Sequence, residues 1–119
     1  MQYTPKPYTS KTQMKMSARV SNMGFIVEDD ASFPPYFIDI FLIEFHLGIE
    51  CDGHWSHKLR KSKDPQRDRF LMETYSLPII RFPKMKDCTL EHVMDFINKW
   101  DDSVEERKQK NLDARSKIV

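Results

Sequence analysis

The feature that most restricts the fold of this chain is a pair of short apolar segments that carry acidic residues inside them. In the first, Tyr36–Leu42, apolar side chains alternate with a face that includes Asp39. The second, Leu47–Asp52, alternates in the same way and places Glu50 and Asp52 on one face. A period of two residues is typical of a half-buried β-strand. Because only a short turn separates the segments, we expect an antiparallel hairpin.

The remaining sequence predicts helices and one more strand around this hairpin. We expect a helix over residues 10–23, a short apolar piece at 25–27 and a polar loop over 28–32. Asp64 followed by Pro65 predicts the start of a helix that runs to Tyr75. The apolar run 77–82 predicts an interior strand that returns parallel to the hairpin. Thr89 is expected to cap a further helix, over residues 89–104.

These elements predict an α/β fold: a single small domain in which a mixed β-sheet with an antiparallel hairpin is flanked by helices. On the hairpin, Ile38, Ile40 and Leu42 are expected to face one way. The length of 119 residues suffices for one domain with a real core. We expect residues 1–9 to form a flexible N-terminal arm, residues 10–104 the functional domain, and residues 105–119 a charged helix extension or tail.

Composition excludes several classes of protein. Only three glycines occur, too few for a glycine-rich phosphate loop. No apolar run reaches the length of a membrane span, and the N-terminus lacks a signal-peptide core, so we expect a soluble cytoplasmic protein without a membrane partner. Cys51 and Cys88 suit a reducing compartment and do not indicate a disulfide framework.

Asp39, Glu50 and Asp52 are expected to converge at one end and one face of the hairpin. A buried carboxylate is costly unless a cation or another partner compensates its charge. Three converging carboxylates form a site of hard oxygen ligands suited to Mg²⁺, with Mn²⁺ as a substitute. Such an ion can activate a bound water and polarise a phosphate oxygen. The alternative for each acid is an ion pair with Lys or Arg, or exposure to solvent.

The loop that leaves the second strand carries further candidates. His57 could act as a general base, or as an acid for the leaving group, and His54 is its rival. Trp55 could stack against a base or simply pack over the hairpin. A zinc site built from Cys51, His54 and His57 would have three ligands at most, with Cys51 on the core side, so zinc is disfavoured.

Basic residues follow the acidic cluster directly. The net charge of +1 does not by itself indicate a nucleic-acid partner. A cationic rim beside carboxylates nevertheless suits a phosphodiesterase, because the substrate and the metal ligands are both anionic; a solvated basic loop is the alternative. Arg67 could neutralise a phosphate or pair with a strand carboxylate. The candidate DNA-binding residues are Trp55, Lys58, Arg60, Lys61, Lys63 and Arg67.

With these residues assembled, the chain resembles the PD-(D/E)XK, or restriction-endonuclease-like, superfamily. Within it, the sequence is most similar to the very-short-patch-repair-like nucleases and their relatives, including a group of phage homing endonucleases. The resemblance extends from about Gln13 to Phe82. It is carried by the segments Tyr36-Phe37-Ile38-Asp39, Ile49-Glu50-Cys51-Asp52-Gly53 with His57 beyond, Asp64-x-x-Arg67-Asp68-x-x-Leu71 and Ile79-Ile80-Arg81-Phe82.

The resemblance implies a mixed sheet flanked by helices and a Mg²⁺-dependent nuclease. It implies metal ligation by Asp39 and by a carboxylate of the Glu50–Asp52 pair, with His57 and Asp64 completing the site. Many relatives have a lysine where this chain has Asp52, so His57 or a metal-bound water must do the work of that lysine. Many also have Glu on the first helix, where Gln13 stands here. The zinc-ligand set of the very-short-patch enzymes is incomplete, so their mismatch specificity is not carried over.

Three functions compete at this point. The first is a metal-dependent DNA endonuclease, which would nick as a monomer or cut both strands as a two-fold homodimer. The second is a non-cleaving nucleic-acid-binding module on a nuclease-like fold. The third is a structural or assembly protein that docks through the helix at 89–104. The resemblance also suggests a phage or mobile-element origin. The candidate catalytic residues are Asp39, Glu50, Asp52, His57, Asp64 and Gln13.

Overall fold

Four strands form one mixed sheet in the order β1-β2-β3-β4. The computed structural model describes residues 11–51 and 64–118. Within them, β1 pairs antiparallel with β2, β2 pairs antiparallel with β3, and β3 pairs parallel with β4. The strands span Val27–Phe33 (β1), Tyr36–Leu42 (β2), Leu47–Cys51 (β3) and Ile79–Phe82 (β4).

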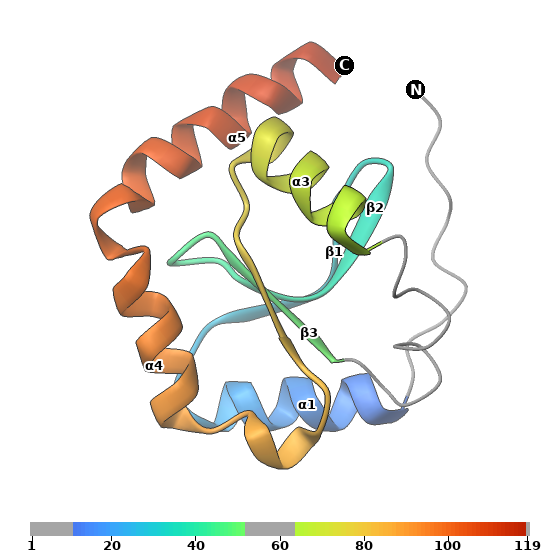
Figure 1. Ribbon diagram of the computed structural model, residues 1–119, viewed down its shortest axis with the longest axis vertical. Helices are drawn as coiled ribbons and strands as arrows, with labels where there is room; N and C mark the ends of the chain where they lie inside the picture. Colours follow the sequence, from blue (N-terminus) through green and yellow to red (C-terminus); the bar gives the residue numbers. More distant parts are fainter. Residues whose placement is uncertain (1–10, 52–63, 119) are drawn as a thin grey trace.

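Helices cover both faces of this sheet, as Figure 1 shows. The helices are α1 (Lys11–Asn22), α3 (Asp64–Tyr75), α4 (Leu90–Lys99) and α5 (Val104–Ile118), with short 3₁₀ turns η1 (Met85–Asp87) and η2 (Asp101–Ser103). None of the helices in the described part of the chain is long and apolar enough to cross a membrane. The protein is therefore a small α/β domain with a mixed sheet flanked by helices, as the sequence predicted.

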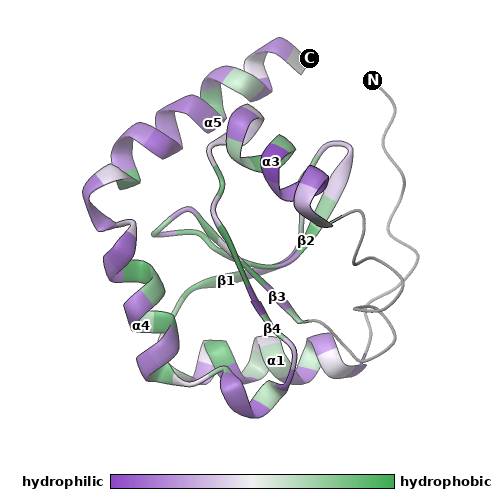
Figure 2. Ribbon diagram, in the orientation of Figure 1, coloured by the Kyte–Doolittle hydropathy of each residue, from purple (hydrophilic) through white to green (hydrophobic). Residues whose placement is uncertain are grey.

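The sheet separates two apolar clusters. One lies against α1 and α4, where Met16, Val20, Val93 and Ile97 pack onto Ile40, Leu42, Leu47 and Ile49. The other lies against α3 and includes Phe33, Ile38, Leu71, Tyr75 and Leu77, with Ala114 of α5 at its margin. Figure 2 shows the same division, with apolar strands in the middle and hydrophilic residues along the outside of α3 and α5. Helices α1, α3 and α4 therefore bury apolar side chains against the sheet, whereas α5 packs mainly against α3.

The hairpin and the parallel return of β4 are confirmed, but the predicted loop over residues 28–32 is wrong. These residues belong to β1, the edge strand that pairs with β2. The acidic run there has a low intrinsic preference for strands. It is held by tertiary contacts, because Ser17 and Gln13 of α1 donate hydrogen bonds to Asp29 and Asp30. An edge strand with charged side chains also resists pairing with other chains.

The single helix expected over residues 89–104 is also wrong in its extent. Thr89 does cap α4, because its side chain accepts the N–H of His92, but α4 ends at Lys99. The carbonyl of Trp100 then accepts hydrogen bonds from Ser103 and from Arg107 of the next helix. The chain thus turns at η2, and α5 begins as a separate helix at Val104.

Arg107 fixes α5 to the turn between β2 and β3. Its side chain is 3% exposed and donates to the carbonyls of Phe45, at 3.0 Å, and of His46. Farther along α5, the guanidinium of Arg115 lies 4.5 Å from the ring centroid of Phe33 and donates to the carbonyl of Ser32. A guanidinium can satisfy several carbonyls at once because its donors are fixed in a planar fork. The charged C-terminal segment is therefore a packed helix.

The pH dependence of folding should report on His46, which is 2% exposed and has Nε2 2.9 Å from the carbonyl oxygen of Tyr75. Burial lowers the pKa of His46 from 6.5 to about 4, against the effect of that hydrogen bond, and Arg107 and Arg115 add to the lowering. Between these pH values the unfolded chain binds more protons, so stability falls as the pH falls. We expect urea unfolding to show a loss of about 3 kcal/mol between pH 7 and pH 4 from this residue.

The control for this prediction is a pair of histidine variants. His46→Asn keeps a residue that tolerates the positive φ of 51° at this position and removes the titrating ring. It should flatten the decline between pH 6.5 and pH 4, whereas His92→Gln, on the exposed surface of α4, should keep it. An undiminished decline in His46→Asn would contradict the assignment.

Gly48 lies where β3 approaches its neighbours most closely. A Cβ atom at this residue would come within 2.6 Å of Ile79 Cδ1 and 3.1 Å of Ile38 Cγ2. Gly48→Ala should therefore lower the free energy of unfolding by about 1–3 kcal/mol through overpacking. Adding Ile79→Val, which removes the Cδ1 methyl, should recover part of this loss in thermal unfolding. Strictly additive effects of the two substitutions would show that the contact is not the cause.

Candidate functional site

Two carboxylates meet where the regular pairing of β2 and β3 stops. The ladder runs from Leu42–Leu47 to Ile40–Ile49. Beyond it, the backbone N–H of Asp39 donates to Glu50 Oε2 at 2.9 Å, and the N–H of Cys51 donates to Asp39 Oδ2 at 3.0 Å. The side chains of Asp39 and Glu50 thus replace the carbonyl groups that would otherwise continue the ladder. Hydrogen bonds from backbone N–H groups to ionised carboxylates are stronger than ordinary ladder bonds.

The alternation of β2 also breaks at Asp39. Ile38 packs in the cluster against α3, whereas Ile40 belongs to the cluster against α1 and α4. The expectation that Ile38, Ile40 and Leu42 share one face is therefore wrong. The β1–β2 ladder pairs Asp29 with Ile40 and Ala31 with Ile38, which leaves Asp30 and Asp39 facing each other between these two pairs. Asp30 has a φ of 53°, in the left-handed region. A local change of strand direction places Asp39 at a bend, as bulges do beside many active sites.

Glu50 is fully buried and forms an ion pair with α3. Its Oε1 lies 2.6 Å from Arg67 Nη1 and 3.9 Å from Arg81 Nη2. The closer contact lacks the angles of a hydrogen bond, so it acts as attraction between charges. A carboxylate with no exposed surface requires such compensation. Of the two roles expected for Arg67, the structure shows the pairing with a strand carboxylate.

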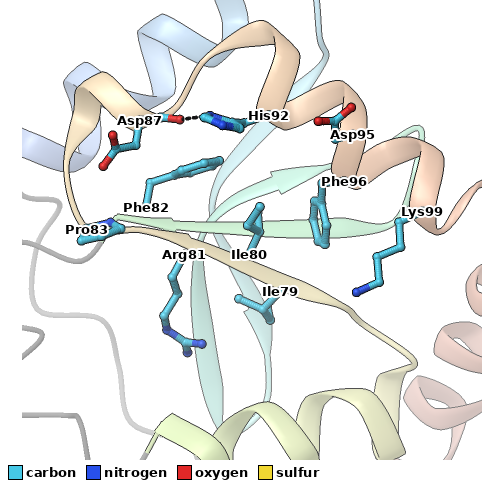
Figure 3. Close-up of a pocket in the computed structure, with 10 residues that line it drawn as sticks. All are labelled: Ile79, Ile80, Arg81, Phe82, Pro83, Asp87, His92, Asp95, Phe96 and Lys99. Atoms are coloured by element: carbon cyan, nitrogen blue, oxygen red, sulfur yellow. Dashed lines mark hydrogen bonds between the residues drawn. The ribbon is translucent and has the colours of Figure 1, made fainter.

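Arg67 and Arg81 connect this pair to a wider network. Arg67 also donates to the carbonyl of Phe37 at 2.9 Å, and its guanidinium lies 5.5 Å from the ring centroid of Tyr36. Arg81 makes a two-point ion pair with Asp68 of α3. Figure 3 shows the Arg81 side chain on the side of β4 away from α4. The network therefore ties β2, β3 and β4 to α3 directly beneath the candidate site.

Gln13 connects the first helix to the same place. It is 4% exposed, and its Nε2 donates to the carboxylate of Asp30 and, at 3.3 Å, to the backbone carbonyl of Asp39. Asp30 was missed in the sequence because it lay in the predicted loop. The register of β1 and β2 would have revealed it, since Asp30 stands opposite Asp39. Arg81 was missed as well, although a charged residue inside an apolar strand was the available signal.

Several predicted site residues lie outside the described residues. Cys51 is described, and its buried side chain belongs to the cluster against α1 and α4, on the core side as expected. Asp64 opens α3, but its side chain is not among those described. Within the described ranges, no group of three His, Cys, Asp or Glu side chains is placed to hold a metal ion. The predicted residues outside these ranges are Asp52, His54, Trp55, His57, Lys58, Arg60, Lys61 and Lys63.

A cavity of about 550 Å³ lies elsewhere, between β4 and α4. As Figure 3 shows, Ile80, Phe82 and Phe96 form its apolar wall, and His92 Nδ1 lies 2.7 Å from the carbonyl oxygen of Asp87 at its rim. Arg81, which also belongs to the network around Glu50, is among the residues that line the cavity.

Comparisons of the chain with models of protein families, with curated proteins and with solved structures find no match. The site must be interpreted from its own residues. Its described part consists of two carboxylates that accept backbone N–H groups across the β2–β3 pair, a buried cationic network beneath them and an amide from α1 beside them.

Loss of the Arg67 charge should be strongly destabilising. Arg67→Met would leave Glu50 buried without its closest counter-charge, at a cost of about 3–5 kcal/mol in urea unfolding. Combining Arg67→Met with Glu50→Gln should recover part of this loss. The matched control is Lys110→Met, which removes the exposed ion pair with Glu106 and should cost less than about 1 kcal/mol. Equal losses of unfolding free energy in Arg67→Met and Lys110→Met would refute a structural role for the buried pair.

Proposed function

We propose that this protein is a metal-dependent DNA endonuclease that hydrolyses phosphodiester bonds. The observation that supports the proposal most strongly lies where the β2–β3 ladder ends: Glu50 accepts the backbone N–H of Asp39, and Asp39 accepts the backbone N–H of Cys51. The arrangement holds two acidic side chains side by side at the end of the sheet, where hard oxygen ligands for a divalent cation can gather. The resemblance to PD-(D/E)XK nucleases points to the same two residues.

The chemistry of the site fits a hard divalent cation. An ionised carboxylate has two oxygens with about four acceptor positions, so Asp39 can accept the Cys51 N–H and still ligate an ion. Mg²⁺, with Mn²⁺ as a substitute, would supply an activated water and stabilise charge on the phosphate. We assign Asp39, Glu50 and Asp52 to its ligation. Because Arg67 offsets the charge of Glu50, Glu50 offers the ion less negative charge than an unpaired carboxylate would.

The remaining candidates receive supporting roles. Gln13 orients the bend of β2 by holding the carbonyl of Asp39 and the carboxylate of Asp30. His57 serves as the proton acceptor or donor, and Asp64 completes the polar site. Arg67 fixes Glu50 and does not contact DNA, because its side chain is occupied by Glu50 and Phe37. DNA contacts are assigned to the segment that carries Trp55 and the basic residues at 58, 60, 61 and 63. Two free buried cysteines suit a cytoplasmic protein.

A non-cleaving nucleic-acid-binding module is the second candidate. The buried ion pair between Glu50 and Arg67 favours it, because Glu50 is satisfied there without any metal ion. Under this proposal, the carboxylates only hold the strands together. The binding module predicts salt-sensitive binding of nucleic acid with no cleavage product under any metal.

The test is cleavage of supercoiled plasmid with Mg²⁺ or Mn²⁺ by the wild type and by Asp39→Asn. We expect cleavage by the wild type only, with a loss of about 100-fold or more in the variant, because the removed charge stabilises the bound ion. Nicked circles alone would indicate a monomeric enzyme, and linear product would indicate cutting by a dimer.

The control is Asp113→Asn on the exposed surface of α5, which should cleave like the wild type. Thermal unfolding of all three proteins separates loss of activity from loss of the fold. Full activity of a folded Asp39→Asn would overturn the site assignment. No product from the wild type, on plain, branched and mismatched DNA alike, would select the binding module.

A further inference from the structure

Helix α1 presents an exposed surface that carries only positive charge. Its buried face is formed by Gln13, Met16, Ser17 and Val20. Lys11, Lys15 and Arg19, spaced four residues apart, are exposed on the other side. None of the twelve residues of α1 is acidic. The row therefore lacks the i,i+4 ion pairs that usually offset a line of cations on a helix.

A second basic segment lies beside this helix. Lys84 and Lys86, in the connection from β4 to α4, are exposed. Arg19 Nε donates to the carbonyl of Cys88 at 2.6 Å, which joins α1 to that connection. Figure 1 shows the connection running alongside α1, and Figure 2 shows hydrophilic residues on both. Cations from distant parts of the sequence thus share one surface, formed by Lys11, Lys15, Arg19, Lys84 and Lys86.

This surface lies near the candidate site at the end of β4. Cys51, whose N–H donates to Asp39 Oδ2, pairs in register with Phe82, and Lys84 follows Phe82 by two residues. The buried face of α1 contacts the same place, since Gln13 donates to the backbone carbonyl of Asp39, while Lys11 and Lys15 are exposed on the other side of the helix. A polyanion held by these cations would therefore run along the end of the sheet where Asp39 lies.

We propose that these five residues bind the phosphate backbone of duplex DNA beside the candidate site. The proposal rests on the proposed nuclease function, and it adds a contact surface remote in sequence from the basic segment at 58–63. Carboxylates repel a polyanion, so a nuclease of low net charge needs cations next to the site. Lysine ammonium groups contact phosphates as point charges and read no base sequence. The surface accordingly positions DNA of any sequence.

The test is fluorescence anisotropy of a labelled 20-base-pair duplex with the full chain in EDTA, over a range of salt concentrations. Lys84→Ala with Lys86→Ala should weaken binding roughly tenfold or more at 0.1 M salt. The slope of log affinity against log salt should fall by about one for each phosphate that the variant no longer neutralises. Lys11→Ala with Lys15→Ala should act in the same way.

The matched control is Lys110→Ala with Lys117→Ala, which removes two exposed cations of α5. It should leave the affinity and the slope close to those of the wild type. Two results would overturn the proposed DNA-binding surface. One is unchanged binding in both the Lys11/Lys15 and the Lys84/Lys86 variants; the other is equal weakening in the α5 control. Because the assay contains no divalent metal, its result is independent of cleavage. The binding assay can therefore contradict this DNA-binding surface while the plasmid assay supports the nuclease, and the reverse can also occur.

Discussion

The burial of Glu50 is the constraint on which the rest of the structure depends. A carboxylate with no exposed surface at the centre of a sheet must be neutralised, and Arg67 of α3 provides the charge at 2.6 Å. The ion pair ties α3 to β3, the strand that lies between β2 and the parallel strand β4. Arg81 of β4 then joins Glu50 to Asp68, so one network sets the positions of three elements.

The same group also shapes the end of the hairpin. Glu50 Oε2 accepts the N–H of Asp39, and Asp39 in turn accepts the N–H of Cys51. Gln13 of α1 donates to the backbone carbonyl of Asp39, so this residue is held from both β3 and α1. Structural and proposed catalytic roles therefore meet in the same residues. A nuclease on this scaffold would use an already rigid pair of acids, which limits the cost of holding a metal site.

Much of the fold could be predicted because local patterns agree with the tertiary arrangement. The two-residue period of Tyr36–Leu42 and the short turn after it determined the hairpin. The Asp64-Pro65 start and the apolar run that ends at Phe82 determined the crossover. Prediction failed at residues 28–32, where an acidic segment forms a strand because it pairs with β2 and accepts hydrogen bonds from α1. It also failed at Trp100, whose carbonyl is satisfied by Arg107 from the next helix.

The sequence by itself determined the fold class and placed Asp39 and Glu50 within the strands of the hairpin, since both follow from periodicity and residue type. Only the tertiary structure decided which partner each acid has. Glu50 pairs with Arg67, and Asp30 accepts a hydrogen bond from Gln13, in each case across 17 residues of sequence. The pattern of a strand shows that a charge is buried, but not which distant cation neutralises it, because that choice depends on how helices cross the sheet.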